Sequence, residues 1–303
     1  MNGLNRFLGQ IMRTCLTAIF LAMASFVNTS SEASENIVHK LKETGILTIG
    51  TRSDTPPFAF QVEDRNFAGF TIDIIEEIAN GISDDLRVKI STKLITVTVL
   101  DRFQAVQKHK VDMVCGSTTP TWEREAIVDF SVPFFIDGIR ILTFKEYGNF
   151  GVFGLQTKTV GVLKGSTSAQ FVPTRLPNAN IKTFTDSASA MAALEAKEID
   201  AMAGDGIALE YKRVHSKQES NFMLVPKTGV LVWQAFSCVL PENQSKFRDL
   251  VNIQFMKMLN GLENLSGTYA KIYFRWFGGE GVLNYPLDET RQSKLLSSNI
   301  WLN

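Results

Sequence analysis

The sequence lacks a net charge and a set of metal-ligating side chains. Its 31 basic and 31 acidic residues balance, so no net field favours a nucleic acid or an anionic membrane, and any partner must be recognised locally. The sequence has three histidines, His39, His109 and His215, and none stands at the spacing of a zinc site. We therefore expect no metal, no other cofactor and no nucleic-acid partner.

The sequence also lacks an apolar run long enough to span a bilayer. The run from Leu16 to Val27 falls below the ~20 residues needed to cross hydrocarbon. Arg6 and Arg13 precede this run, and small polar residues ending at Ala33 follow it. That order is typical of a secretory signal peptide rather than of a membrane anchor. The sequence therefore predicts a signal peptide over residues 1–33 and a periplasmic location.

Cysteine is scarce as well, with three in the sequence. Cys15 precedes the apolar run and should be removed with the signal peptide. The mature chain then holds Cys115 and Cys238 in a compartment that permits disulfides, so we expect a bridge between them. The alternative is two buried free thiols that behave as small apolar side chains.

The remaining sequence has the composition of an ordinary globular protein, with 45% hydrophobic and 20% charged residues. Its periodicity predicts strands at 46–51, 86–95, 112–115, 159–163 and 199–203, and helices at 70–79, at 100–108, just after 165–168, at 187–196 and from Asp205. This order predicts two successive blocks of alternating strands and helices. Such blocks build two parallel-sheet lobes with loops at the carboxyl ends of their strands.

Later segments connect and complete these lobes. The apolar, extended segments 138–144 and 229–238 can cross from one lobe to the other, and helical spacing at 247–258 and 269–277 predicts a return to the first lobe. We expect an α/β fold with lobe 1 at 34–143, lobe 2 at 144–237 and a return to lobe 1 at 238–303. Each lobe is then a sheet flanked by helices, and two crossing hinge strands join them.

The most informative segment follows the strand that ends near Cys115. Gly116 turns the chain, hydroxyl groups follow from Ser117 to Thr119, and Arg124 stands one to two helical turns further on. Hydroxyls and carbonyls can accept the protons of an ammonium group, while a guanidinium holds a carboxylate through two parallel bonds. The alternative is a solvated helix in which Arg124 is flanked by acidic side chains.

This segment resembles the signature of the extracellular solute-binding proteins of polar amino-acid ABC transporters, and in detail their glutamate/aspartate-binding branch. The resemblance rests on Cys115-Gly-Ser-Thr-Thr119, Glu123-Arg124, Phe130-Ser131 and Gly138-Ile-Arg-Ile-Leu-Thr143, and it runs from Leu41 to Phe277. It implies the two-lobed periplasmic-binding fold of type II. It also implies a monomer that binds an acidic amino acid and delivers it to a membrane permease.

The resemblance assigns a role to each part of an amino acid. Arg124 holds the α-carboxylate, helped by backbone amides near Ser166 and Thr167, where a helix N-terminus favours an anion. The ammonium group is bound by Ser117, Thr119 and Asp205. Asp205 has the alternative role of a helix N-cap, and both roles can hold at once.

The resemblance places Arg52 and Arg102 at the distal carboxylate of the ligand. Three guanidinium groups around one cleft repel one another, so a ligand with two carboxylates suits them. Arg102 has the alternative of a surface position beside Asp101. Phe58 is expected to cover the methylenes of the ligand, with ordinary core packing as its alternative.

Two positions depart from the branch. Val99 stands where the branch has a serine, and Ser187 stands where it has a histidine. Lost hydrogen bonds there would shift the preference between aspartate, glutamate and their amides. Cys115 and Cys238 match cysteines that are bridged in that branch, which supports the disulfide.

Two other function classes compete with this interpretation. Some relatives of this fold are dehydratases or cell-wall hydrolases, but the matched positions supply arginines, hydroxyls and one acid occupied by an ammonium group, so we expect no enzyme. A ligand-sensing receptor domain would use the same closure to signal. Because the chain ends at 300–303 without a membrane helix, such a receptor needs a separate membrane partner, and we expect a permease instead.

Overall fold

The computed structural model describes residues 36–62 and 66–299, and the predicted signal peptide lies outside this part of the chain. None of the helices in the described part combines the length and apolar character that crossing a membrane requires.

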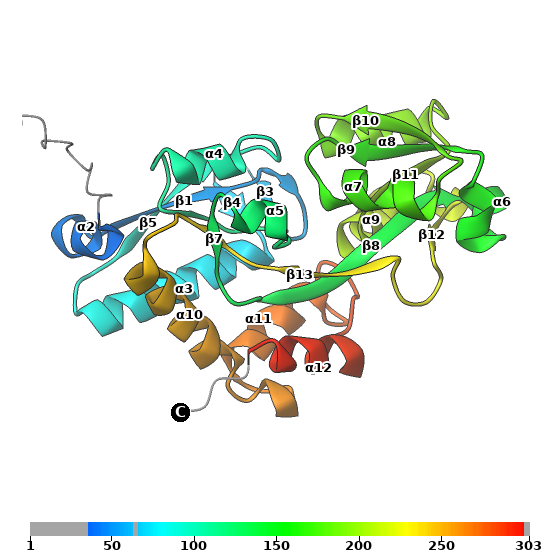
Figure 1. Cartoon of the computed structure of the whole chain (residues 1–303). Helices are drawn as coiled ribbons and strands as arrows, with labels where there is room; N and C mark the ends of the chain where they lie inside the picture. The colour runs from blue at the N-terminus through cyan, green and yellow to red at the C-terminus, as the bar shows by residue number, and fades with distance from the viewer. Residues whose placement is uncertain (1–35, 63–65, 300–303) are drawn as a thin grey trace, which may run out of the picture. The chain divides into compact units, whose positions relative to one another are not determined.

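The first lobe is built on a five-stranded mixed sheet (Figure 1). Its strands lie in the order β5 (Ser91–Thr96), β1 (Ile46–Thr51), β6 (Met113–Val114), β14 (Val239–Leu240) and β7 (Asp129–Phe130). The first three strands are parallel, and β14 is antiparallel to both of its neighbours. A short antiparallel sheet of β2 (Asp54–Thr55), β3 (Ala59–Gln61) and β4 (Phe67–Ala68) follows β1 in the chain.

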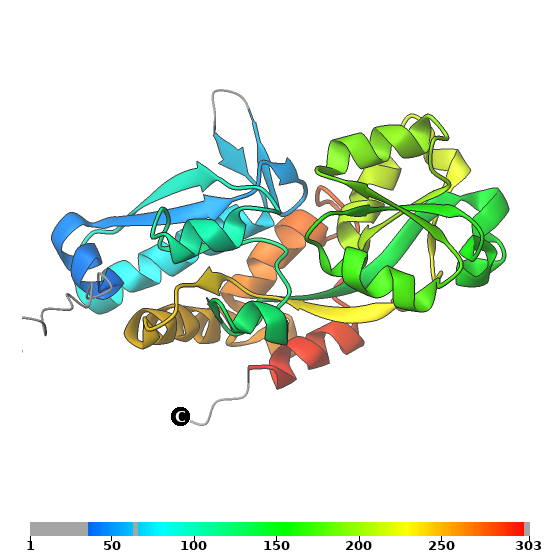
Figure 2. The same cartoon turned by 45° about the horizontal axis from the view of Figure 1, so that its top comes forward.

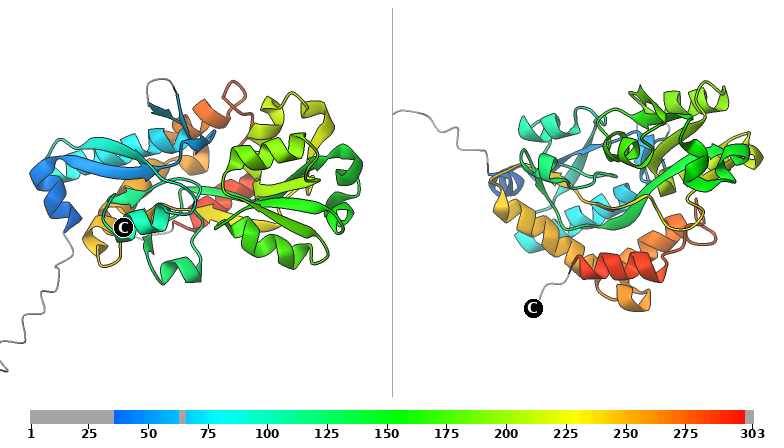
Figure 3. Two further views of the ribbon diagram at one scale, coloured as in Figure 1. Left: turned by 90° about the horizontal axis from the view of Figure 1, so that it is seen from above. Right: turned by 45° about the vertical axis from the view of Figure 1, so that its right-hand side comes forward.

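Helices bury both faces of the first sheet. One face packs in a large core with α2 (Ile37–Thr44), α3 (Phe70–Leu86), α10 (Ser245–Leu259), α11 (Gly267–Phe277) and α12 (Glu289–Ser297). The other face packs against α4 (Arg102–Gln107), and the short helix α5 (Trp122–Glu125) precedes β7. The C-terminal helices α10 and α11 contact α3, as the gold, orange and cyan ribbons show (Figure 3). The C-terminal helices thus pack in the same core as α3.

The second lobe is built on a six-stranded mixed sheet. Its strands are β10 (Asn180–Phe184), β9 (Thr159–Leu163), β11 (Ala201–Asp205), β8 (Phe135–Phe144) and β12 (Phe222–Val225), with β13 (Val232–Phe236) also paired to β8. One face is covered by α7 (Thr167–Arg175), and the other by α8 (Ser187–Glu195) and α9 (Gly206–His215) (Figure 2). The short helices of this lobe are α6 (Lys145–Gly148), η2 (Gly151–Leu155) and η3 (Glu219–Asn221). The short helix η4 (Leu262–Asn264) lies between α10 and α11 and packs in the first core.

Two strands cross between the lobes, β8 and its antiparallel partner β13. Phe135 of β8 lies in the core of the first lobe, whereas Ile141 and Leu142 lie in the two cores of the second. Phe236 of β13 likewise packs in the first core, and Val232 packs against the second lobe. The expected pair of crossing strands is therefore confirmed. The lobe boundaries at residues 143 and 237 remain a prediction.

Two expectations about local structure are wrong. The sheets are mixed rather than parallel, because strands from the crossing segments complete both of them. The strand expected at 86–95 begins at Ser91, because α3 continues to Leu86 and Arg87 ends it in the left-handed conformation, with φ 55°. Ile90 is buried just before this strand, and together with Leu86 and Val88 it extends the apolar alternation that suggested a longer strand.

Cys115 and Cys238 form a disulfide, as expected from export. The bond joins the residue after β6 to the residue before β14, and it closes a sequence separation of 123 residues.

We predict that removing this bond lowers the free energy of unfolding by ~2–4 kcal/mol, because the cross-link restricts the unfolded chain. Urea unfolding of Cys115→Ala/Cys238→Ala measures the loss. Wild-type protein that is unfolded under reducing conditions is the control, since it retains both buried sulfur atoms. Equal stability of the oxidised and reduced wild-type proteins would contradict the prediction.

Candidate functional site

A cavity of about 70 Å³ lies where the ends of strands from both lobes face one another. Such strand ends are the usual ligand sites of α/β proteins, because loops there carry groups that the sheet does not use. Arg52 follows β1, Ser117 follows β6, Ser166 follows β9 and Asp205 ends β11. Room of this size holds several water-sized groups, as a small polar ligand needs.

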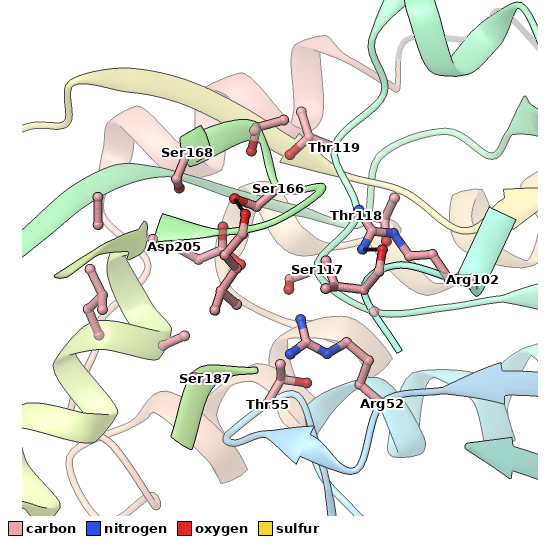
Figure 4. Close-up of a pocket in the computed structure, with 18 of the residues that line it drawn as sticks. Arg52, Thr55, Arg102, Ser117, Thr118, Thr119, Ser166, Ser168, Ser187 and Asp205 are labelled. Atoms are coloured by element: carbon pink, nitrogen blue, oxygen red, sulfur yellow. Dashed lines mark hydrogen bonds between the residues drawn. The ribbon is translucent and has the colours of Figure 1, made fainter. Parts of the chain in front are cut away.

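Eight of the nine residues expected at the ligand line this cavity. They are Arg52, Arg102, Ser117, Thr119 and Arg124 from the first lobe, and Ser166, Thr167 and Asp205 from the second. Figure 4 shows Arg52, Arg102 and Ser117 on one side of the cavity and Ser166, Ser187 and Asp205 on the other. Val99 and Ser187, the two departures from the resembled branch, also line it. The roles of these residues toward a ligand remain predictions.

Phe58 is the exception, and its expected ligand contact is corrected. Its side chain is fully buried and does not line the cavity. The ring packs edge-on against Phe135 at 5.0 Å and Phe236 at 5.5 Å between centroids. These partners belong to the crossing strands, so Phe58 anchors the hinge end of the first core. Phe58 therefore has the alternative role given for it above, which is ordinary core packing.

Backbone carbonyls hold the guanidinium groups of Arg102 and Arg124. Arg124 donates to Thr119 O at 2.6 Å and to Gly165 O at 3.1 Å. Arg102 donates to Val99 O at 2.6 Å and to Gly165 O at 3.4 Å. Gly165 has φ +77°, a left-handed conformation that glycine adopts without strain, so its carbonyl is available to both arginines.

The ring of Phe103 supports the same two guanidinium groups. The guanidinium carbon of Arg102 lies 4.7 Å from the ring centroid, and that of Arg124 lies 5.2 Å away. A cation is attracted to the face of an aromatic ring, which partly offsets the loss of water.

Arg102 is the most strongly perturbed cation of the site. Its side chain is 4% exposed, so the alternative of a surface residue is excluded. Burial, followed by repulsion from Arg124 and Arg52, lowers the pKa of Arg102 to about 9, and the group stays charged at neutral pH. Its Nε also has no hydrogen-bond partner among the described residues. An anion placed beside Arg102 would relieve both effects.

Arg52 is paired already within its own lobe. Its Nε and one terminal nitrogen each donate to a different oxygen of Asp54, both at 2.8 Å. This pairing fixes the guanidinium plane at the end of β1, and Figure 4 shows the group pointing into the cavity.

Asp205 occupies the N-cap position of α9 but makes no side-chain cap hydrogen bond. Asp137 of the crossing strand β8 replaces it, because its Oδ2 accepts from the amide of Ile207 at 2.9 Å. The carboxylate of Asp205 therefore remains directed to the cavity. Burial raises the pKa of Asp205, while a hydrogen bond with Ser117 and the three arginines favour its charged form.

The start of α7 offers backbone amides to the cavity. Ser166 caps this helix, and its hydroxyl accepts from the amide of Ala169 at 3.2 Å. The amides of Thr167 and Ser168 come before that of Ala169 in the first turn. Gln234 of β13 donates to the hydroxyls of Thr119, at 3.1 Å, and of Thr167. The side-chain amide of Gln234, on a hinge strand, thus connects the polar loops of the two lobes.

Sequence reasoning missed four polar residues that line the cavity. They are Thr55, Thr118, Ser168 and Lys212. Thr118 and Ser168 adjoin residues that were identified, so proximity in the sequence was an available signal. Lys212 lies seven residues after Asp205, which places both on one face of a helix. Among the described residues, no group of three or more potential ligands is arranged to hold a metal ion.

We predict that the buried carboxyl of Asp137 makes stability depend on pH. Burial raises its pKa to about 6, although Ile207 and Tyr285 donate hydrogen bonds to it. Between pH ~4, the pKa of an unfolded aspartate, and pH ~6, the folded protein holds more protons than the unfolded chain. This carboxyl therefore makes the protein less stable as pH rises through that interval, by an amount on the order of 3 kcal/mol.

The variant Asp137→Asn should lack this contribution, since its amide does not titrate. Urea unfolding of both proteins at pH 4.5 and pH 7 measures this contribution. Between pH 4.5 and pH 7, the wild type should lose more stability than the variant. Identical pH dependence in the two proteins would show that Asp137 does not titrate in this range.

Comparisons with known proteins agree with this architecture. The family model of bacterial extracellular solute-binding proteins, family 3, matches residues 47–279. A glutamate/aspartate import solute-binding protein of Escherichia coli (strain K12) is 24% identical over 88% of this chain and 89% of its own. An L-cystine-binding protein of the same strain is 25% identical over 86% of this chain and 93% of its own.

A crystal structure shares the fold. It is an ancestral amino acid-binding protein, described as a precursor of cyclohexadienyl dehydratase, with a TM-score of 0.69 and 26% identity over 80% of this chain and 99% of the other. The two-lobed α/β architecture expected from the sequence is confirmed by this match.

Proposed function

Because the chain belongs to the bacterial extracellular solute-binding proteins of family 3, we propose that it captures an acidic amino acid between its lobes and delivers it to the permease of an ABC transporter. It acts in the periplasm as a monomer. The family membership supports an amino-acid ligand, and the charges of the cavity support an acidic one.

The charge balance of the cavity carries the proposal. Among the described residues, its lining holds four cations, Arg52, Arg102, Arg124 and Lys212, and one carboxylate, Asp205. Asp54, just outside the lining, neutralises Arg52. A neutral amino acid leaves this excess of positive charge unchanged, whereas glutamate or aspartate brings one net negative charge into it. A cationic amino acid would add a fifth cation and is disfavoured.

Each end of the ligand has a partner of opposite charge. Arg124 and the first amides of α7 bind the α-carboxylate, which combines a bidentate guanidinium with a helix N-terminus. Asp205, with the hydroxyls of Ser117 and Thr119, binds the ammonium group. Arg102 and Arg52 bind the distal carboxylate.

Binding closes the two lobes, because the partners of the ligand are split between them. Arg102, Arg124 and Ser117 belong to the first lobe, whereas Ser166 and Asp205 belong to the second. Neither lobe alone satisfies both charged ends of an amino acid. A ligand shifts the balance toward the closed form by its differential affinity, which this division supplies.

The site supports binding rather than catalysis. The one carboxylate in the described lining, Asp205, faces three guanidinium groups and is matched to an ammonium group. The dehydratase alternative needs an acid or base of tuned pKa aimed at the substrate. Incubating the protein with glutamate and following the sample by proton NMR tests this alternative, since any new product would contradict a binding role.

Isothermal titration with glutamate, aspartate, glutamine, asparagine, arginine and cystine tests the function. We expect glutamate or aspartate to bind at least tenfold more tightly than the amides and arginine not to bind. X-ray scattering with and without the tightest ligand should show a smaller radius of gyration in the complex. Preferred binding of glutamine, cystine or arginine would overturn the acidic assignment while leaving the transport role intact.

A further inference from the structure

Lys212 lies on the face of α9 that lines the cavity. Asp205, Ala208, Leu209 and Lys212 all line it, and their spacing of three, four and seven residues places them on one side of a helix. Seven residues span ~10.5 Å along a helix axis. The Cα–Cβ bonds of a helix tilt toward its N-terminus, so the side chain of Lys212 leaves α9 in the direction of Asp205.

The ammonium group of Lys212 has no bonded partner in the described part of the chain. It makes no hydrogen bond or ion pair with any of the residues that the structure describes, and burial lowers its pKa. The charges of Asp54 and Asp186 act on it, but both carboxylates are engaged elsewhere. Asp54 pairs with Arg52, and Asp186 caps α8 through Ser189 at 2.8 Å.

The protein compensates this cation only through the nearby charges of Asp54 and Asp186, without a bonded partner among the described residues. Lys212 is half-buried, and a partly desolvated ammonium group without a bonded partner opposes folding unless a counter-charge arrives. The same lining carries the hydroxyls of Thr55 and Ser187, which follow Asp54 and Asp186 in the chain and can complete hydrogen bonds to an anion. An incoming carboxylate is therefore the chemical group that this corner of the cavity fits.

We propose that Lys212 is a specificity-determining residue that binds the distal carboxylate of the ligand from the second lobe. The proposal rests on the function proposed above and names a further residue of the same site. Arg52 and Arg102 approach the distal carboxylate from the first lobe, so Lys212 gives this carboxylate a partner on both lobes. Closure then depends on the distal acid itself, and an amide ligand closes the lobes less completely.

The test compares the variants Lys212→Met and Lys212→Arg with the wild type by titration with glutamate, aspartate, glutamine and asparagine. Methionine keeps the length and apolar stem of lysine without its charge, and arginine keeps the charge. We expect Lys212→Met to bind the tighter acid ~10- to 100-fold more weakly, the effect of one lost charge-assisted contact, with amide binding changed less than threefold. Lys212→Arg should retain the preference for the acid. The matched control is Lys217→Met, at an exposed lysine just beyond α9, and it should bind as the wild type does.

The outcomes separate this proposal from the proposed function. If the wild type prefers acids and Lys212→Met loses affinity equally for acids and amides, the lysine only supports the lobes and the proposal is overturned. Unchanged acid binding in Lys212→Met overturns it as well. If the wild type itself prefers a neutral or cationic amino acid, the proposed function fails first, and the role of Lys212 fails with it. Circular dichroism of each variant verifies that it is folded.

Discussion

Arg124→Ala should abolish the binding of every amino acid, because each of them carries the α-carboxylate that this guanidinium holds. The group is placed by its bonds to Thr119 O and Gly165 O, which belong to different lobes. Removing one partner of a desolvated, charge-assisted pair costs about 5 kcal/mol at the upper end, which exceeds a thousandfold in affinity. Isothermal titration with glutamate and glutamine should therefore show no measurable heat at concentrations that saturate the wild type.

Two further variants sharpen this prediction. Arg124→Lys keeps the charge but lacks the planar fork, so it should bind more weakly than the wild type and more tightly than Arg124→Ala. Arg175→Ala removes an exposed arginine from the last turn of α7 and should bind normally. Affinity within threefold of the wild type in Arg124→Ala would refute the assigned role.

Arg102→Met should separate acids from amides and should also stabilise the protein without ligand. Arg102 is buried beside two other guanidinium groups, and its Nε has no partner among the described residues. Replacing it with an apolar side chain of similar length removes desolvation and repulsion together. Dicarboxylates should lose ~2–5 kcal/mol of binding, about thirtyfold or more, while amides lose far less.

Thermal unfolding and titration measure the two effects on the same samples. The melting temperature without ligand should rise in Arg102→Met, and the further rise that glutamate or aspartate causes should nearly vanish. For comparison, a ligand at ~100-fold excess over its dissociation constant stabilises a protein by ~2.7 kcal/mol. Equal losses of affinity for glutamate and glutamine would show that Arg102 does not bind the distal carboxylate.

The chain that returns from the second lobe had weak signals in the sequence. Strands β12 and β14 are short, with four residues in β12 and two, Val239 and Leu240, in β14. Their strand character comes from the ladders that receive them and not from local propensity. The expectation of parallel sheets failed because β12 and the crossing strand β13 both pair antiparallel to β8.

The two alternatives left open for Phe58 and for Arg102 illustrate the same limit. Both residues follow a turn or begin a helix, and nothing in their neighbours states which way they face. Tertiary packing turns Phe58 into the core with Phe135 and Phe236, and it encloses Arg102 beneath Gly165 of the other lobe. Contacts that join residues 60 or more positions apart in the chain leave no local pattern.

The sequence by itself determined the α/β class, the two crossing strands, the paired cysteines and most of the polar residues that line the cavity. The fold class and the crossing strands depend on apolar periodicity, and the cysteine pair depends on export. Most of the cavity residues were identified by the resemblance to a family of solute-binding proteins, together with the run of hydroxyls before Arg124. Only the tertiary structure decided that Asp137 caps α9 in place of Asp205, and that Lys212 lines the cavity without an ion pair to any described residue. Those facts depend on distance and burial across the hinge, because electrostatic energy is set by which charges meet after folding and not by their order in the chain.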